Sequence, residues 1–356
     1  MNIKVDKKKP VCVTGANGFI ASWLVKKLVE EGVTVHATVR DLKDVSKIDH
    51  LKKISKKGPG KVVLFESNLL IENSFSKAMA NCSIVFHTAS PFIVDVKKLK
   101  NAKKDLFDPA VEGTKNVVNS VNKTKSIKRL VLTSSCAAIY GDAADLQNIE
   151  DGTLTEENWN YTSSMEHQPY SYSKVTAERL CWEELKKQDR WDLVVINPPV
   201  VLGPSLSETN TSGSLDLMKA FGDGSLKSGA PPIQVGMVNV IDVAEAHFKG
   251  GYLKNASGRY IVCEKSLSFL DLARIFEKEF NNFVFPKKEL PKWLVWLVGP
   301  IMDKSITRKM ISRNMGHSWK ADNSKGIKEL GLKYNSVEKA AVKMFQQMID
   351  LDVFRK

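Results

Sequence analysis

The chain contains few cysteines and few arginines. Its five cysteines are scattered, with no C-x-x-C pair and no Cys/His cluster of zinc-like spacing, so neither a disulfide scaffold nor a metal site is expected. This cysteine usage is typical of a reducing compartment, and we predict a cytoplasmic protein. Arginine makes up 9 of 53 basic residues, and lysines are spread along the chain, often beside acidic residues. Despite a net charge of +13, no nucleic-acid surface is therefore predicted.

Long apolar runs are also lacking. The first ten residues, MNIKVDKKKP, are not followed by the apolar region of a secretory signal. The segment WLVWLVGPIM (293–302) is too short to span a bilayer, so we expect no stable membrane insertion. We interpret it as a buried helix or as a helix that lines or covers a substrate pocket. A membrane-surface helix is the alternative, because Lys304, Arg308 and Lys309 follow it.

With 356 residues and 43% hydrophobic content, the chain can form a large core. Short apolar runs alternate with helical patterns: PVCVTG, VTVHATVR, KVVLFES, SIVFHTAS, IKRLVLTSS and WDLVVINPP are strand candidates, and GRYIVCEK is a later one. This alternation predicts an α/β protein with a doubly wound parallel sheet (Rossmann) and a smaller C-terminal substrate domain. We assign 1–203 to the cofactor domain, with about 234–265 returning to it. The ranges 204–233 and 266–356, which lack a clear pattern, are assigned to the substrate domain.

The segment VTGANGFIA follows the first strand and opens the first helix. Gly15 permits the tight turn, Gly18 lets a pyrophosphate approach the backbone, and Ala21 allows close packing of helix on strand. The spacing G-x-x-G-x-x-A in this position predicts a dinucleotide-binding turn.

The end of the second strand indicates which dinucleotide binds. An acidic residue there would hold a ribose 2′-hydroxyl, whereas this chain has Arg40, followed by Lys47. Because a guanidinium accommodates a 2′-phosphate, we predict NADP (as NADPH) rather than NAD.

The segment QPYSYSKVTAE contains two tyrosines ahead of one lysine. On a helix, residues four apart share a face, so Tyr170 meets Lys174 while Tyr172 points elsewhere. A Y-x-x-x-K pattern is common by chance, so the pair indicates chemistry only in combination with the dinucleotide turn.

The motifs VTGANGFIA, VFHTASP, VLTSSCAA, YSYSK and NPPVVLGP resemble, in order and spacing, those of extended short-chain dehydrogenases/reductases. Within them the chain is similar to the dihydroflavonol 4-reductase and cinnamoyl-CoA reductase group and its aldehyde/ketone reductase relatives. The resemblance implies an NADPH-dependent reductase of a small-molecule aldehyde or ketone, acting as a monomer or homodimer.

The resemblance also implies individual roles. Tyr170 would donate a proton to the carbonyl oxygen, Lys174 would lower the tyrosine's pKa and bond the nicotinamide ribose, and Ser135 would hold the substrate oxygen, with Ser134 a near rival. The cofactor set that it implies is Gly15, Gly18, Phe19, Ile20, Arg40, Lys47, Asn68, Leu69, Thr88, Ala89, Ser90, Tyr170, Lys174, Pro198 and Val201.

Two positions depart from the family pattern. Asn68 stands where an aspartate usually lies near the adenine, and Tyr140 stands where dihydroflavonol reductases tend to carry a polar residue for the flavonoid. The remaining alternatives are a nucleotide-sugar epimerase or dehydratase, a 3β-hydroxysteroid dehydrogenase-like enzyme and a non-catalytic NADP sensor. The epimerase pattern R-x-x-N-x-Y-G-P is replaced here by INPPVVLGP, which favours the reductase.

Overall fold

A computed structural model describes residues 6, 8–90, 101–208, 212–302 and 306–354. Seven strands form an all-parallel sheet in the order β3-β2-β1-β4-β5-β6-β9. Their bounds are β1 Val11–Thr14, β2 Thr34–Val39, β3 Lys61–Glu66, β4 Ile84–His87, β5 Arg129–Thr133, β6 Asp192–Asn197 and β9 Gly258–Ile261. The strand order 3-2-1-4-5-6 is that of a doubly wound dinucleotide-binding sheet, so the predicted fold is confirmed.

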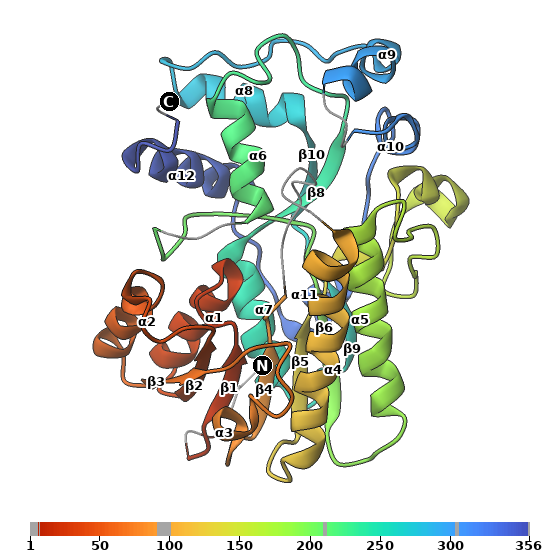
Figure 1. Ribbon diagram of the computed structural model, residues 1–356. Helices are drawn as coiled ribbons and strands as arrows, with labels where there is room; N and C mark the ends of the chain where they lie inside the picture. Colours follow the sequence, from red (N-terminus) through yellow and green to blue (C-terminus); the bar gives the residue numbers. More distant parts are fainter. Residues whose placement is uncertain (1–5, 7, 91–100, 209–211, 303–305, 355–356) are drawn as a thin grey trace.

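Helices cover both faces of this sheet, which explains why the strands are apolar almost throughout (Figure 1). Val11 and Val13 of β1 join the core formed with α1 and α7, whereas Cys12 between them faces the core formed with α3, α4 and α5. The helices are α1 Phe19–Glu30, α2 Val45–Lys57, α3 Ser76–Met79, α4 Asp108–Lys123, α5 Pro169–Leu185 and α7 Val240–Tyr252.

A second sheet combines β7 Val200–Leu202, β8 Gln234–Asn239 and β10 Lys265–Ser268 in the order β10-β8-β7. The segments that lacked a clear pattern are largely helical. They form α6 Gly213–Gly222, α8 Phe269–Glu279, α9 Lys292–Met302, α10 Arg308–Asn314, α11 Ser324–Leu330 and α12 Val337–Asp350. Of the range 234–265, which was predicted to return to the cofactor domain, residues 234–239 pair in the second sheet, whereas α7 and β9 belong to the seven-stranded part. The domain boundaries stay a prediction.

The apolar segment 293–302 lies in α9, and the expectation that it is a buried helix is wrong. No residue of α9 is buried, because the helix packs at the molecular surface against α10. Lys304 lies outside the described residues. Among the described helices, none combines the length and apolarity needed to cross a bilayer.

A fully buried carboxylate connects α5 to β9 and to the carboxyl ends of β5 and β6. Glu178 Oε1 lies 2.6 Å from Arg259 Nε of β9, and its Oε2 accepts hydrogen bonds from Ser134 Oγ (2.5 Å) and Asn197 Nδ2 (2.9 Å). The Arg259 Nε–H does not point along a hydrogen-bond direction, so we describe this contact as an ion pair. Arg259 also donates to the carbonyl of Asn158 and stacks 4.0 Å from the Trp159 ring.

Replacing this carboxylate leaves a buried cation without its partner. We expect Glu178→Gln to lower the free energy of unfolding by about 3–5 kcal/mol, as measured in urea. The control on the same helix is Glu183→Gln, because Glu183 is exposed; it should change stability by less than about 0.5 kcal/mol. Equal stability of the two variants would contradict a structural role for the Glu178–Arg259 pair.

Candidate active site

The turn between β1 and α1 has the shape that the glycine spacing predicts. Gly15 has φ of +62°, and a Cβ there would lie 2.9 Å from Ala89 Cβ, so both backbone and space require glycine. Gly18 begins α1 without a side-chain cap, and the first turn of α1 carries no acidic residue. The first-turn amides are thus available to an anion at a helix N-terminus, which fits a dinucleotide pyrophosphate.

Thr14 holds the ends of β1 and β4 together beside this turn. Its Oγ1 accepts hydrogen bonds from the amides of Thr88 (3.2 Å) and Ala89 (3.1 Å), and its carbonyl accepts from Thr88 Oγ1. The segment of VFHTASP that the structure describes therefore lies against the turn, as expected for a crevice at the carboxyl edge of the sheet.

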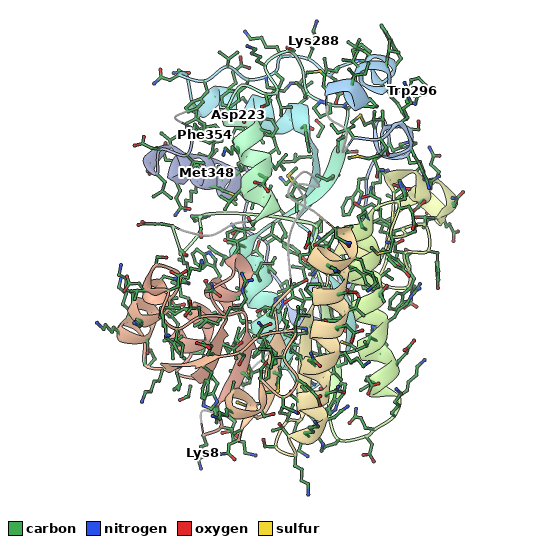
Figure 2. All side chains as sticks on the ribbon, viewed as in Figure 1. Lys8, Asp223, Lys288, Trp296, Met348 and Phe354 are labelled. Atoms are coloured by element: carbon green, nitrogen blue, oxygen red, sulfur yellow. The ribbon has the colours of Figure 1, made fainter. Side chains whose placement is uncertain are left out.

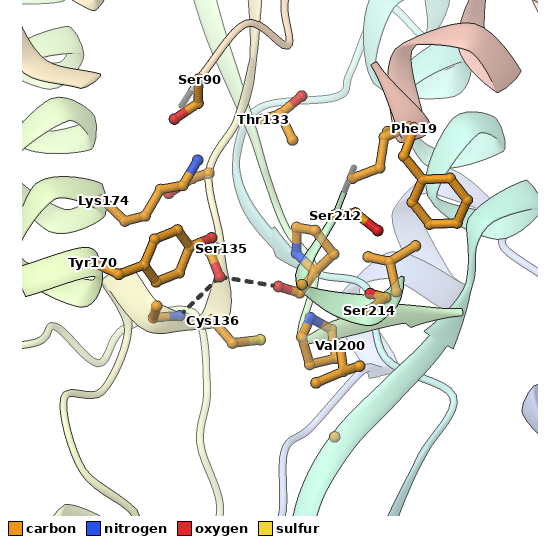
Figure 3. A pocket seen from close by; sticks show the side chains of 18 of the residues that line it. Phe19, Ser90, Thr133, Ser135, Cys136, Tyr170, Lys174, Val200, Ser212 and Ser214 are labelled. Atoms are coloured by element: carbon orange, nitrogen blue, oxygen red, sulfur yellow. Dashed lines mark hydrogen bonds between the residues drawn. The ribbon is translucent and has the colours of Figure 1, made fainter. Parts of the chain in front are cut away.

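A cavity of about 490 Å³ opens at this edge. One wall carries Lys174, Tyr170 and Ser135, and Phe19, Ser212 and Ser214 lie across from them (Figure 3). The structure brings most predicted site residues into its lining: Gly18, Phe19, Ile20, Thr88, Ser90, Ser135, Tyr170, Lys174, Pro198 and Val201. Gly15 and Ala89 do not line the cavity; they pack closely against each other behind its surface.

Besides Gly15 and Ala89, four predicted cofactor residues do not line the cavity. Arg40 is exposed just after β2 and forms no ion pair with a described acidic side chain, whereas Lys47 of α2 pairs with Asp44 at 2.6 Å. Asn68 Oδ1 caps a local turn by accepting from the Leu70 amide at 2.9 Å. Leu69 packs against α4, where a Cβ on Gly113 would approach it to 2.9 Å. Their cofactor roles stay predictions.

The two tyrosines of the quoted segment lie in different environments. Tyr170 lines the cavity, and Lys174 Nζ lies 5.8 Å from the centre of its ring. Tyr172 instead stacks on Phe107, with ring centres 5.2 Å apart, and is absent from the lining. The helical-face argument thus identifies the tyrosine that shares the cavity with the lysine.

The two neighbouring serines also separate. The Ser134 hydroxyl donates to buried Glu178, whereas the Ser135 hydroxyl faces the cavity, accepts from the Ala137 amide at 3.1 Å and interacts with Tyr170. Ser135 is therefore the serine placed to contact a bound molecule beside Tyr170.

Burial dominates the titration of the central pair. It lowers the pKa of Lys174 to about 8, against the opposing effect of Glu178. Burial raises the pKa of Tyr170, and its hydrogen bond with Ser135 only partly opposes this. The expectation that Lys174 lowers the tyrosine's pKa is not met in this structure, where desolvation outweighs other effects. A raised pKa keeps Tyr170 protonated at neutral pH.

The sequence analysis missed the wall opposite Tyr170. Ser212 and Ser214 at the start of α6 lie across from Tyr170, and the lining continues through residues of α6, β8 and the start of α8: Leu217, Val235, Gly236 and Phe269. No local pattern marks these residues as site residues, because tertiary packing brings them to the cavity. Glu178 was missed too. Its position four residues after Lys174, on the same face of the helix, was a signal in the sequence that could have identified it.

The fold, the glycine-containing turn and the cluster of Ser135, Tyr170 and Lys174 together define a dinucleotide-dependent protein of the short-chain dehydrogenase/reductase type. The sequence profile of the NAD dependent epimerase/dehydratase family matches residues 11–224, and the chain belongs to that family.

The similar proteins confirm the predicted group within it. The chain is 40% identical to cinnamoyl-CoA reductase CAD2 of Medicago truncatula, covering 78% of this chain and 83% of the relative. It is 33% identical to an anthocyanidin reductase of Vitis vinifera, over 78% of this chain and 83% of the relative. Among solved structures, yeast methylglyoxal/isovaleraldehyde reductase Gre2 complexed with NADPH superposes with a TM-score of 0.76 at 26% identity, covering 97% and 99%.

The lowered pKa of Lys174 predicts a pH dependence of stability. The folded value of about 8 lies below the ordinary 10.5, so between these values the unfolded chain binds more protons than the folded one. The contribution of Lys174 to the free energy of unfolding therefore rises with pH, by at most about 1.4 kcal/mol per pH unit.

Urea unfolding of the cofactor-free protein at pH 7.5, 8.5 and 9.5 tests this, with Lys174→Met as the comparison. Wild type should gain stability relative to Lys174→Met as the pH rises. A constant difference would show that Lys174 titrates normally.

Proposed function

We propose that this chain is an NADPH-dependent reductase of aldehyde or ketone carbonyls, with Tyr170 as proton donor. The observation that carries the proposal is the cavity in which Ser135, Tyr170 and Lys174 share one wall with the glycine turn at its edge. Its similarity to cinnamoyl-CoA and anthocyanidin reductases, and to an NADPH complex of Gre2, supports both reaction and cofactor.

Each residue of the site has a separate role in the proposed reaction. The amides at the start of α1 would hold the pyrophosphate of a bound NADPH, and Lys174 would bond its nicotinamide ribose. NADPH supplies a hydride to the carbonyl carbon. Ser135 orients the carbonyl oxygen, and Tyr170, kept neutral by burial, transfers its hydroxyl proton to that oxygen as the C–O bond becomes that of an alcohol. The positive charge of Lys174 then stabilises the tyrosinate until a proton returns.

The described lining favours a neutral, largely apolar substrate. Lys174 is its one charged side chain, and the lining also includes the apolar side chains of Leu217, Val235 and Phe269. The two phosphates of a nucleotide sugar would find no cation other than Lys174 among the described lining residues, which disfavours the epimerase alternative. Loss of NADPH absorbance across a panel of neutral aldehydes and ketones tests the proposed substrate class. No turnover of any of them would contradict it.

The proposal also includes the setting of the enzyme. It works in the cytoplasm as a monomer or homodimer, with 1–203 and about 234–265 binding the cofactor and 204–233 and 266–356 facing the substrate. The five buried free thiols support a reducing compartment.

The proton-donor assignment predicts that the two tyrosines behave differently. Tyr170→Phe should lower kcat by about 10²–10⁴-fold with little loss of NADPH affinity, because only the transferred proton is removed. Tyr172→Phe is the matched control and should retain most turnover, since Tyr172 stacks on Phe107 away from the cavity. The assignment fails if the control is the inactive variant.

Cofactor choice depends on Arg40. We expect wild type to bind NADPH more than tenfold more tightly than NADH, because a charge-assisted contact to the 2′-phosphate contributes about 1.5–3 kcal/mol. Arg40→Asp should abolish or reverse that preference in a fluorescence titration. Lys43→Asp, also just after β2, is the control for a general loss of positive charge. Equal wild-type affinity for both cofactors would reject the role of Arg40.

A further inference from the structure

The outward face of α9 is apolar, the reverse of an ordinary surface helix. Trp293, Trp296, Leu297 and Ile301 are 68%, 40%, 50% and 78% exposed. Their spacing of i, i+3, i+4 and i+8 places them on one side of the helix. No charged side chain interrupts residues 293–302. We call these four side chains the α9 face.

The fold does not use this face. None of its residues lines the cavity beside Tyr170, so it is not part of the substrate wall. The other side of the helix makes the intramolecular contacts: a Cβ on Gly299 would lie 3.5 Å from Ile311 Cδ1 of α10 and 3.6 Å from Ile306 Cγ2. The α9 face therefore remains open to solvent after the chain has folded.

Positive charge surrounds the α9 face. The described residues of the range 287–309 include five lysine or arginine residues and one acidic residue. Arg308 lies over the Trp296 ring, 4.7 Å from its centre, and Lys309 is exposed without an ion pair to any described acidic group. Lys288 and Trp296 both lie at the end of the molecule far from Lys8, which marks the opposite end (Figure 2).

We propose that the α9 face binds the surface of anionic lipid bilayers. Tryptophan side chains prefer the level of the lipid headgroups, leucine and isoleucine enter the acyl boundary, and the surrounding lysines and arginines attract anionic headgroups. This combination of an apolar stripe with flanking cations distinguishes a lipid surface from an uncharged protein surface.

A second copy of the chain fits the face less well. Four side chains provide far less area than the roughly 800 Å² per partner that a stable interface buries. Two copies joined through this face would also bring two sets of cations together, which opposes association.

The binding is peripheral. A helix of 11 residues is about 16 Å long, half the thickness of the hydrocarbon core, so α9 lies along the surface. Adsorption is therefore reversible and sensitive to salt, because exposed charges are screened at high ionic strength.

Co-sedimentation with vesicles tests the proposal on the full-length protein. We expect binding to vesicles of phosphatidylcholine with about 30% phosphatidylserine at physiological salt, and much weaker binding to pure phosphatidylcholine. The double variant Trp293→Ser/Trp296→Ser should bind on the order of tenfold more weakly. Lys288→Glu/Lys309→Glu should weaken binding to anionic vesicles and leave the weak binding to neutral ones unchanged.

The control is Leu70→Ser/Ile71→Ser, which removes two exposed apolar side chains at a distant place and should bind like wild type. Unchanged thermal unfolding of every variant shows that the fold is intact. The proposal is overturned if wild type fails to sediment with anionic vesicles, or if the control loses binding as the tryptophan variant does. It is equally overturned if wild type is a dimer by light scattering and the tryptophan variant a monomer.

Discussion

The buried ion pair between Glu178 and Arg259 is the interaction on which the site depends. It joins α5 to β9 and, through Asn197 and Ser134, to the carboxyl ends of β6 and β5. Lys174 stands one turn before Glu178 on the same helix, so the contact fixes the depth and rotation at which α5 presents its face to the cavity. The Ser134 hydroxyl donates its hydrogen bond to Glu178, whereas the hydroxyl of Ser135 faces Tyr170.

Burial of Tyr170 and Lys174 away from water also determines the pKa values of these two side chains. Desolvation penalises a charge on either member of the central pair, so the lysine binds its proton less tightly and the tyrosine binds its proton more tightly. Near neutral pH both groups still hold a proton, because the lowered pKa of Lys174 stays at about 8 and the pKa of Tyr170 lies above its usual range. This is the starting state that the proposed mechanism requires, in which Tyr170 donates a proton and the positive charge of Lys174 stabilises the tyrosinate.

The parts of the structure that were predicted from sequence are those determined locally. Apolar strand runs, the turn around Gly15 and the four-residue spacing of Tyr170 and Lys174 each fix a conformation or a face through neighbours in the chain. The wall formed by Ser212, Val235 and Phe269 could not be predicted, because tertiary packing assembles it. Segment 293–302 was misjudged because apolar composition does not reveal which side of a helix is covered.

Cys136 illustrates how the cavity tolerates reactive molecules. Its thiol is 2% exposed at the cavity wall and donates to the Asn197 carbonyl at 3.3 Å, and burial raises its pKa. Alkylation by an electrophilic carbonyl compound requires the thiolate, which this environment suppresses. A reductase of carbonyl compounds can thus carry a cysteine next to Ser135 at its cavity wall while the reactive thiolate form stays suppressed.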